Sequence, residues 1–283
     1  MTKLNTLIED IYSKIECISD GKDLEIPDAM AEEFGERMKQ ALLHWAKPKA
    51  QTKGLRMSNI GKPSRQLWYE SRDESNKNKL SSPVLIKFLY GHLLEELLLL
   101  FVKLSGHEVT DEQKEVEVNG ILGHMDCKID GEVVDVKTAS GRAFNKFKSG
   151  TLAEDDPFGY IAQLCGYEEN EGTSEGGFLA INKESGELAL YRPEELDKIN
   201  IKDKINKTKE ALTFDTPPPR CYNEEPDGKS GNMKIHKNCY YCPYKFECYS
   251  DANEGKGIRT FLYSKGPVYL TKVEKAPRVE EVA

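Results

Sequence analysis

The sequence predicts an α+β protein in which helices flank a central mixed sheet. Apolar residues recur at three- and four-residue intervals near the N-terminus and again around residue 90, which indicates helices. Between residues 109 and 139 they alternate instead, and Asn119-Gly120 and Asp130-Gly131 mark tight hairpin turns. Cysteines cluster near the C-terminus. We therefore expect a helical N-terminal region, a mixed core and a cysteine-rich C-terminal segment.

Three helices are expected in the first part of the chain. The first two follow the apolar residues at 4–15 and 30–42. The longest helix begins after Pro83 and covers residues 85–104, and Gly106 can end it in a left-handed cap. Its run of leucines is shorter than the roughly 20 apolar residues that span a bilayer, so we expect a buried core helix.

The later elements alternate between strands and helices. Residues 109–139 are expected to form an antiparallel meander, and residues 157–169 a further helix. Two short strands are expected within residues 177–189, followed by a charged helix over residues 193–211. The prolines at 217–219 then mark a domain boundary.

These elements give four expected parts. Residues 1–82 form a helical region with a basic segment, and residues 83–216 form the core. Residues 217–273 hold the cysteine cluster, and residues 274–283 form a flexible tail. The N-terminus carries no apolar signal core, so we expect a cytoplasmic protein without membrane contact.

The charge distribution leaves two basic stretches in an acidic chain. The formal net charge is -8, so binding of phosphate groups would require local clusters of Lys and Arg. One stretch contains Lys47, Lys49, Lys53, Arg56, Lys62 and Arg65, and the other contains Lys137, Arg142, Lys146 and Lys148. Each stretch fits a nucleic-acid contact or, equally, a basic face exposed to water.

The hairpin at Asp130-Gly131 brings two acidic residues together. A two-residue turn there pairs Ile129 with Glu132, and counting outward sets Asp126 opposite Asp135. Directly opposed side chains have Cβ atoms about 5 Å apart, and like charges at that distance destabilise a sheet unless a cation lies between them. The register therefore predicts a site for a divalent cation.

A lysine completes this arrangement. The same register sets His124 opposite Lys137, and strand alternation puts Asp135 and Lys137 on one face. Phosphodiester hydrolysis uses carboxylates that hold Mg²⁺ and a lysine that offsets charge in the transition state. A charged hairpin face exposed to water would contain the same residue types.

Four short segments resemble the motifs of a nuclease superfamily. Gly123–Asp126 and Val134–Thr138 resemble the hairpin motif of the PD-(D/E)XK nucleases. Gly91–Glu95 and Gln163–Tyr167 resemble two helical motifs of its RecB-like branch, the second at i and i+4 spacing. The resemblance spans residues 91–167 and implies a restriction-endonuclease-like core.

The resemblance also implies roles for individual residues. The residues with implied catalytic roles are Glu95, Asp126, Asp135, Lys137, Gln163 and Tyr167. Glu95, Asp126 and Asp135 would bind Mg²⁺ or Mn²⁺, Lys137 would assist catalysis, and the last two would support the active site or the DNA. Glu96 and His92 remain alternatives to Glu95 as the metal ligand from the helix.

The cysteines form a second candidate site. Cys239, Cys242 and Cys248 follow a C-x2-C-x5-C pattern, and Cys221 lies eighteen positions before it. Four thiolates can hold Zn²⁺ or an iron–sulfur cluster. The spacing resembles RecB-like nucleases with a 4Fe-4S cluster, whose fourth cysteine normally lies in a segment resembling residues 57–69. Pro and Ser stand there in this chain, so Cys221 is the expected replacement and Zn²⁺ remains a competitor.

Taken together, the resemblance implies a metal-dependent DNA exonuclease of a bacteriophage type. It would act in phage recombination, replication or host DNA degradation, in the host cytoplasm, with DNA and phage recombination or replication proteins as partners. One alternative is a structure-selective or single-strand DNA endonuclease that uses the same site. Another is a non-catalytic DNA-binding module whose working part is the four-cysteine metal site. The oligomeric state stays open.

Overall fold

The chain divides into two compact units. The computed structural model describes residues 3–48, 54–73 and 80–282. The core unit comprises Met1–Gly61 and Leu80–Asn206, and the cysteine unit comprises Lys62–Lys79 and Lys207–Ala283. The expected boundary at residues 217–219 differs from this division, which falls within helix α7 (Ile201–Leu212).

Residues 62–79 join the cysteine unit through contacts distant in sequence. Helix α3 (Ser64–Arg72) carries Trp68, whose Nε1 donates a hydrogen bond to the carbonyl of Phe214 at 2.8 Å. Arg72 donates to the same carbonyl at 3.0 Å. No local sequence pattern indicates such long-range contacts. The sequence therefore placed this helix in the expected N-terminal part, residues 1–82, and not with the cysteines.

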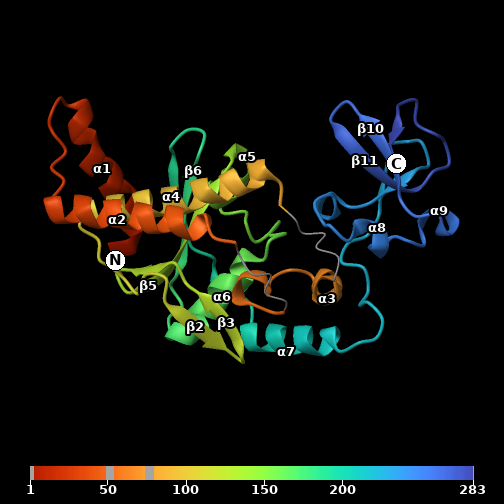
Figure 1. Cartoon of the computed structure of the whole chain (residues 1–283), viewed down its shortest axis with the longest axis horizontal. Coiled ribbons are helices and arrows are strands. Elements are labelled where there is room, and N and C mark those ends of the chain that lie inside the picture. The colour runs from red at the N-terminus through yellow and green to blue at the C-terminus, as the bar shows by residue number, and fades with distance from the viewer. Residues whose placement is uncertain (1–2, 49–53, 74–79, 283) are drawn as a thin grey trace. The chain divides into compact units, whose positions relative to one another are not determined.

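A five-stranded mixed sheet forms the centre of the core unit (Figure 1). Its order is β1-β4-β5-β6-β7, with β5 and β6 parallel and the other pairs antiparallel. The strands are β1 (Val109–Thr110), β4 (Cys127–Ile129), β5 (Glu132–Ala139), β6 (Gly177–Asn182) and β7 (Leu188–Tyr191). The predicted α+β class with a mixed sheet flanked by helices is confirmed.

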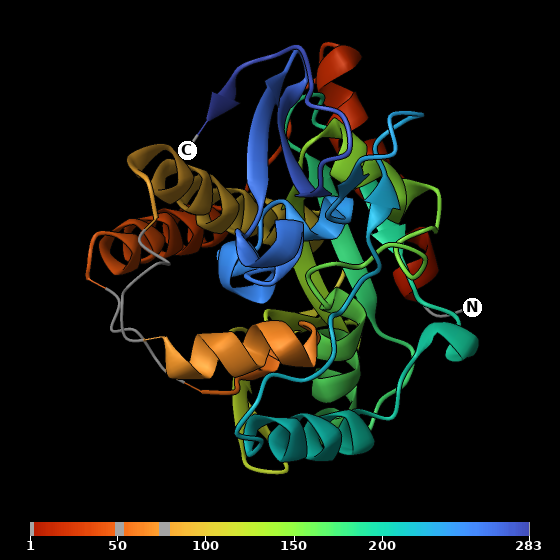
Figure 2. The same cartoon turned by 90° about the vertical axis from the view of Figure 1, so that its right-hand side faces the viewer.

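Helices cover both faces of this sheet (Figure 2). Helices α1 (Leu7–Ser19) and α4 (Ser82–Leu104) pack on one face, and α5 (Gly141–Lys148) and α6 (Tyr160–Glu171) on the other. Helix α2 (Asp28–Trp45) packs against α4. Each face buries its own apolar cluster, which fixes the faces to which successive β5 side chains point.

Helix α4 follows the sequence prediction closely. Pro83 lies in its first turn, and Gly106 directly after its end has φ +89, as a left-handed cap requires. Leu98, Leu99 and Val102 are buried against β4 and β5. Burial of each such side chain contributes about 1.5–3 kcal/mol, so this half of α4 is anchored to the sheet that carries the hairpin.

The expected meander over residues 109–139 is instead two separate sheets. Strands β2 (Glu115–Val118) and β3 (Ile121–His124) pair only with each other. Both predicted turns are present, with positive φ at Asn119-Gly120 and at Asp130-Gly131. The chain leaves the ladder between the sheets because buried Met125 donates its backbone N–H to the carbonyl of Lys114.

The charged helix expected over residues 193–211 is shorter than predicted. A 3-10 turn, η3 (Glu195–Asp197), precedes α7, which begins at Ile201. Two further 3-10 turns are η1 (Lys3–Thr6) and η2 (Met57–Asn59). Within residues 3–48, 54–73 and 80–282, no helix combines the length and hydrophobicity needed to cross a bilayer.

The cysteine unit contains its own sheet, which the sequence did not indicate. Its order is β12-β10-β11-β9-β8. The strands are β8 (Glu225–Pro226), β9 (Met233–Lys234), β10 (Arg259–Tyr263), β11 (Gly266–Lys272) and β12 (Glu281–Val282). The short helical elements are η4 (Lys237–Cys239), α8 (Lys245–Cys248) and α9 (Ala252–Gly255).

Strand β12 replaces part of the expected flexible tail at 274–283. It pairs with β10, with Val282 opposite Thr260. The guanidinium of Arg259 also donates to the carboxylate of Glu281 at 2.8 and 2.6 Å. A bidentate ion pair across two paired strands holds a segment whose composition alone suggested disorder.

Candidate active site and cysteine site

The predicted hairpin register holds up to the base of β4. Ile129 pairs with Glu132 as expected, and the ladder ends at Cys127 and Val134. Asp126 lies one residue beyond this last pair, where its Oδ2 accepts a hydrogen bond from the backbone N–H of Val136 at 2.7 Å. The carboxylate is therefore held next to β5 by a backbone donor.

His124 is not opposite Lys137, so that part of the prediction is wrong. It lies in β3 opposite Glu115, and its ring Nε2 is 3.7 Å from the Glu115 carboxylate. The side chain is 59% exposed. The break at residues 125–126 rotates this strand away from β5, which a count along a continuous ladder cannot anticipate.

Asp126 and Asp135 lie near each other beyond the end of the ladder, although they are not a ladder pair. Burial, and then the negative charge of Asp135, raise the pKa of Asp126 to about 7. Asp135 is fully buried, and apart from an ion pair with Lys137 the described residues give its carboxylate oxygens no hydrogen-bond donor. Buried carboxylate oxygens without donors are the environment that a hard cation satisfies.

Lys137 supplies the positive charge at this site. Its ammonium pairs with Asp135 and lies 4.7 Å from the centre of the Tyr160 ring. Burial alone would lower the pKa of Lys137, but the charges of Asp135 and Asp126 outweigh it and raise the pKa. The side chain therefore remains an ammonium group that can donate hydrogen bonds.

Glu95 is the member of its helical motif that interacts with the two aspartates. Burial, followed by the negative charges of Asp126, Glu96 and Asp135, raises the pKa of Glu95 to about 9. Gln113 donates a hydrogen bond to its Oε1 at 2.8 Å. The carboxyl groups of Glu95, Asp126 and Asp135 thus influence one another, and the pKa values of Glu95 and Asp126 are raised.

The two alternatives to Glu95 face helix α2. The Glu96 carboxylate lies 3.9 Å from the Arg37 guanidinium. The His92 ring packs edge-on against His44, with centroids 6.1 Å apart. Both partners belong to α2, whereas Glu95 bonds Gln113 and has a pKa that responds to the charges of Asp126 and Asp135.

Gln163 and Tyr167 lie one turn apart on α6 and hydrogen-bond to each other. Gln163 Nε2 donates to the Tyr167 hydroxyl at 2.8 Å, and that hydroxyl donates to the carbonyl of His124 at 2.8 Å. The Tyr167 side chain is buried, and a Cβ atom on Gly123 would lie 3.0 Å from its ring. These residues therefore fix the strand that leads into Asp126.

Two residues at this site were missed from the sequence. Tyr160 borders the Lys137 ammonium, and Gln113 bonds Glu95. Tyr160 precedes Gln163 by three residues and Tyr167 by seven, so helical spacing from the recognised motif could have found it. No sequence signal pointed to Gln113, which lies in the loop before β2.

Two described cations of the first basic stretch already make local contacts. Lys49 and Lys53 lie outside the described residues. Lys62 pairs with Glu70 at 3.0 Å, and Arg65 bonds Cys248. This stretch is divided between the two units at Gly61.

In the second basic stretch, one cation of α5 is exposed without a described partner. Lys146 pairs with Asp155 at 3.0 Å, and Lys148 pairs with Glu187. Arg142 is exposed, and no hydrogen bond or ion pair joins it to the residues that the structure describes. Arg142 is thus the residue of this stretch that can meet a phosphate without losing an existing ion pair.

The four predicted cysteines line a single pocket in the cysteine unit. Cys221, Cys239, Cys242 and Cys248 share it with Pro63, Arg65 and Tyr69 from the segment that begins at α3. The position at which the resemblance placed a cysteine therefore borders the pocket, and Cys221 completes the thiol set. Burial, and then the charges of its three neighbouring cysteines, raise the pKa of Cys239 to about 12.

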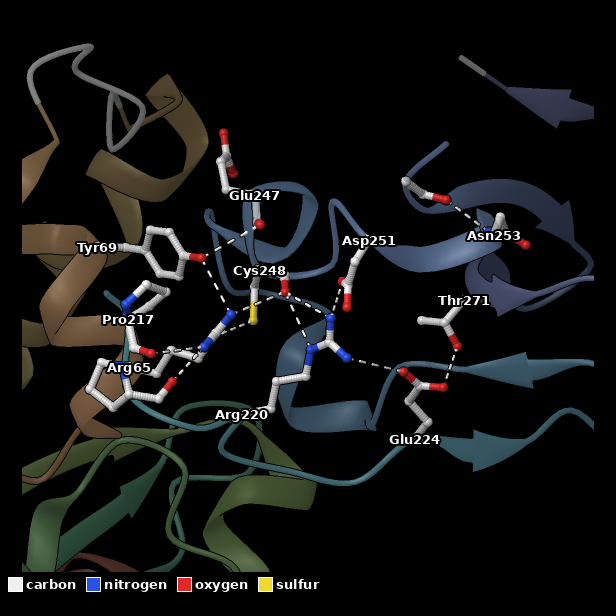
Figure 3. Close-up of polar contacts among 12 residues, drawn as sticks. Arg65, Tyr69, Pro217, Arg220, Glu224, Glu247, Cys248, Asp251, Asn253 and Thr271 are labelled. Atoms are coloured by element: carbon white, nitrogen blue, oxygen red, sulfur yellow. Dashed lines mark hydrogen bonds and ion pairs between the residues drawn. The ribbon is translucent and has the colours of Figure 1, made fainter. Parts of the chain in front are cut away.

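Two arginines hold Cys248, the last residue of α8 (Figure 3). Arg65 Nε donates to Cys248 Sγ at 3.1 Å, and its guanidinium also donates to the Pro217 carbonyl at 3.4 Å. Arg220 donates to the Cys248 carbonyl at 3.2 Å and pairs with Asp251. Both arginines therefore hold Cys248 at the edge of the pocket that the four cysteines line.

Among the side chains of residues 3–48, 54–73 and 80–282, no three Asp, Glu, His or Cys groups stand as close as the ligands of one metal ion. At the hairpin, the Lys137 ammonium occupies the position next to Asp135. The donor chemistry still fits both groups, with carboxylates for a hard divalent cation and thiols for Zn²⁺ or an iron–sulfur cluster.

Similar solved structures exist, while no protein-family model and no curated protein matches the chain. SSO0001 is 16% identical with a TM-score of 0.40, over 74% of this chain and 93% of that one. An alkaline exonuclease, LHK-Exo, from Laribacter hongkongensis is 15% identical with a TM-score of 0.37, over 54% and 89%. LHK-Exo in complex with dAMP is 14% identical with a TM-score of 0.34, over 57% and 92%. These likenesses are distant, so the evidence for a function lies in the chain's own residues.

Proposed function

We propose that this protein is a metal-dependent DNA exonuclease of the RecB-like PD-(D/E)XK type. The observation that carries the proposal is the buried ion pair of Asp135 with the Lys137 ammonium, supported by the raised pKa values of Asp126 and Glu95, to which the charge of Asp135 contributes. The buried Asp135 carboxylate has no donor other than that ammonium among the described residues. A cluster of this composition is costly to a fold without a cation, which favours a functional role over an exposed charged surface.

The three carboxylates would hold the catalytic cation. A bound Mg²⁺ or Mn²⁺ would polarise the phosphate and activate a water molecule for attack. Glu95 and Asp126 have raised pKa values, so binding of the cation releases protons from them. Gln113 orients Glu95, and the Val136 N–H orients Asp126.

Lys137 would act on the charge that develops at the phosphate. Its ammonium is kept protonated by the two aspartates and is positioned over Tyr160. With its charge shared among the carboxylates and a bound cation, this ammonium would be available to donate a hydrogen bond to a phosphate oxygen. Loss of one such donor typically slows a reaction by about a hundredfold or more.

The test is hydrolysis of end-labelled linear DNA and closed circular DNA by purified protein with Mg²⁺. We expect linear DNA to be degraded from its ends, and both EDTA and Lys137→Ala to abolish this. Lys148→Ala is the matched control, because this exposed lysine pairs with Glu187 and should leave the rate unchanged. Cutting of circles would replace the exonuclease with the endonuclease, and no cleavage under any condition would favour the DNA-binding module.

The cysteine site would hold a 4Fe-4S cluster, with Zn²⁺ as the alternative occupant. Four thiols that line one pocket, with Arg65 beside one sulfur, support a thiophilic group there. Visible absorption with iron and sulfide content would identify the cluster, and stoichiometric zinc in a colourless protein would replace it. The bacteriophage setting, the host cytoplasm and partners in recombination or replication follow from the sequence resemblance.

A further inference from the structure

An exposed aromatic ring lies next to the candidate active site. Phe158 is 60% exposed, an unusual position for a phenyl ring. Its inner face stacks on Tyr160 with centroids 5.5 Å apart and an angle of 25° between the rings. Tyr160 in turn carries the Lys137 ammonium over its ring at 4.7 Å. The catalytic lysine and the exposed ring are thus separated by one side chain.

The ring is the outer end of an aromatic column. Tyr160 packs against Phe178, which is fully buried, with centroids 6.4 Å apart. The column therefore runs from the core of the unit through Tyr160 to Phe158 at the surface. A ring supported in this way on one face presents a rigid flat surface on the other.

The loop that carries Phe158 is fixed before any ligand binds. The Asp156 carboxylate accepts hydrogen bonds from the backbone N–H groups of Gly159 and Ile161, both at 2.9 Å. Gly159 has φ +75, and a Cβ atom on it would lie 2.2 Å from the Cα of Gly61. Since the loop is held from both sides, little conformational entropy is lost when something covers the ring.

We infer that Phe158 is a stacking site for an unpaired nucleobase of a DNA strand bound at the active site. This inference rests on the proposed nuclease function and names its substrate as single-stranded DNA or a frayed strand end. Bases within a duplex already have both faces covered, and exposing one requires unstacking. Because one side chain, Tyr160, separates Phe158 from Lys137, the stacked base would lie near the phosphate that is cleaved.

The test measures binding in EDTA, so that no cleavage takes place. A labelled single-stranded oligonucleotide and a blunt duplex of the same sequence are titrated with wild type, Phe158→Ala, Phe158→Trp and Phe214→Ala. Phe214 is a matched control because it is 45% exposed and belongs to the cysteine unit. A second series carries one abasic position at a time along the single strand.

We expect Phe158→Ala to weaken single-strand binding by about 5- to 100-fold and duplex binding much less. Phe158→Trp should retain binding, and Phe214→Ala should match the wild type. An abasic position should weaken the wild type at one place only, and Phe158→Ala should lose this sensitivity. An abasic profile that persists in Phe158→Ala, equal losses on both substrates, or no wild-type binding of single strands would overturn the inference.

A parallel cleavage assay with Mg²⁺ separates the two proposals. If the wild type binds single strands through Phe158 but hydrolyses no DNA, the nuclease function fails and the stacking site stands. If the wild type hydrolyses DNA but Phe158→Ala matches it in KM and in binding, the stacking site fails and the nuclease function stands.

Discussion

Replacement of Lys137 tests whether the stability of the hairpin depends on the buried positive charge of the lysine ammonium group. Lys137→Met keeps the length of the side chain and removes its charge. In the wild type, the side chains of Lys137 and Asp135 are only 18% and 1% exposed. Removal of one partner of a buried ion pair typically costs about 3–5 kcal/mol, because the other charge is left uncompensated.

Protonation sets an upper limit on that cost. An aspartic acid with the ordinary pKa of about 3.9 costs about 4 kcal/mol to protonate at pH 7 and about 1.5 kcal/mol at pH 5. The variant can always escape an uncompensated charge by taking up this proton. The part of its stability loss that comes from the uncompensated charge should therefore be at most about 4 kcal/mol at pH 7 and should shrink as the pH falls.

The assay is urea-induced unfolding of both proteins in EDTA at pH 7 and pH 5. Addition of Asp135→Asn to Lys137→Met removes the uncompensated charge and should recover most of the lost stability at pH 7. Mg²⁺ should also stabilise Lys137→Met, since a cation can take the place of the ammonium. An equal loss at both pH values, with no recovery in the double variant, would refute the buried-charge reasoning.

Three further perturbations probe the surroundings of the two sites. Tyr167→Phe removes the hydroxyl that donates to the His124 carbonyl, so it should lower the free energy of unfolding in urea by about 1–3 kcal/mol. An unchanged urea midpoint would contradict a structural role for this hydrogen bond. Cys248→Ser should lower the iron or zinc content per chain. Cys165 is buried in α6, so Cys165→Ser serves as a control that should leave the metal content unchanged. Equal metal content in the two variants would remove Cys248 from the ligand set. Glu281→Ala breaks the ion pair with Arg259 of β10 and should therefore increase proteolysis after residue 273, which mass spectrometry can measure. An unchanged cleavage pattern would show that β12 stays paired without this ion pair.

Local rules were sufficient for the elements that bear the chemistry. The turn at Asp130-Gly131 fixed the pairing of Ile129 with Glu132, because a two-residue turn leaves only one register. Likewise, i and i+4 spacing on a helix brought Gln163 and Tyr167 into hydrogen-bonding contact. Such geometry is set within a few residues and can be read directly from the chain.

Features that depend on distant partners could not be predicted in this way. The ladder breaks before Cys127, where the Met125 N–H bonds the Lys114 carbonyl and the Asp126 carboxylate accepts from the Val136 N–H, and so His124 lies in another sheet. Helix α3 belongs with the cysteines through Trp68 and Arg65, more than 140 positions away from their partners. Strand β12 similarly depends on a pairing with β10. Tertiary contacts of this kind leave no periodic signal in the sequence.

Glu95 is expected to act together with the two aspartates of the hairpin, and a pair of adjacent substitutions tests this expectation most directly. Glu95→Gln and Glu96→Gln each remove one negative charge from neighbouring positions of α4, and only Glu95 interacts with Asp126 and Asp135. Single-turnover hydrolysis of end-labelled linear DNA would be measured across a Mg²⁺ titration. We predict that Glu95→Gln loses at least a hundredfold in rate, while Glu96→Gln stays within a few fold of the wild type. Equal rates for the two variants would contradict the assignment of the active site.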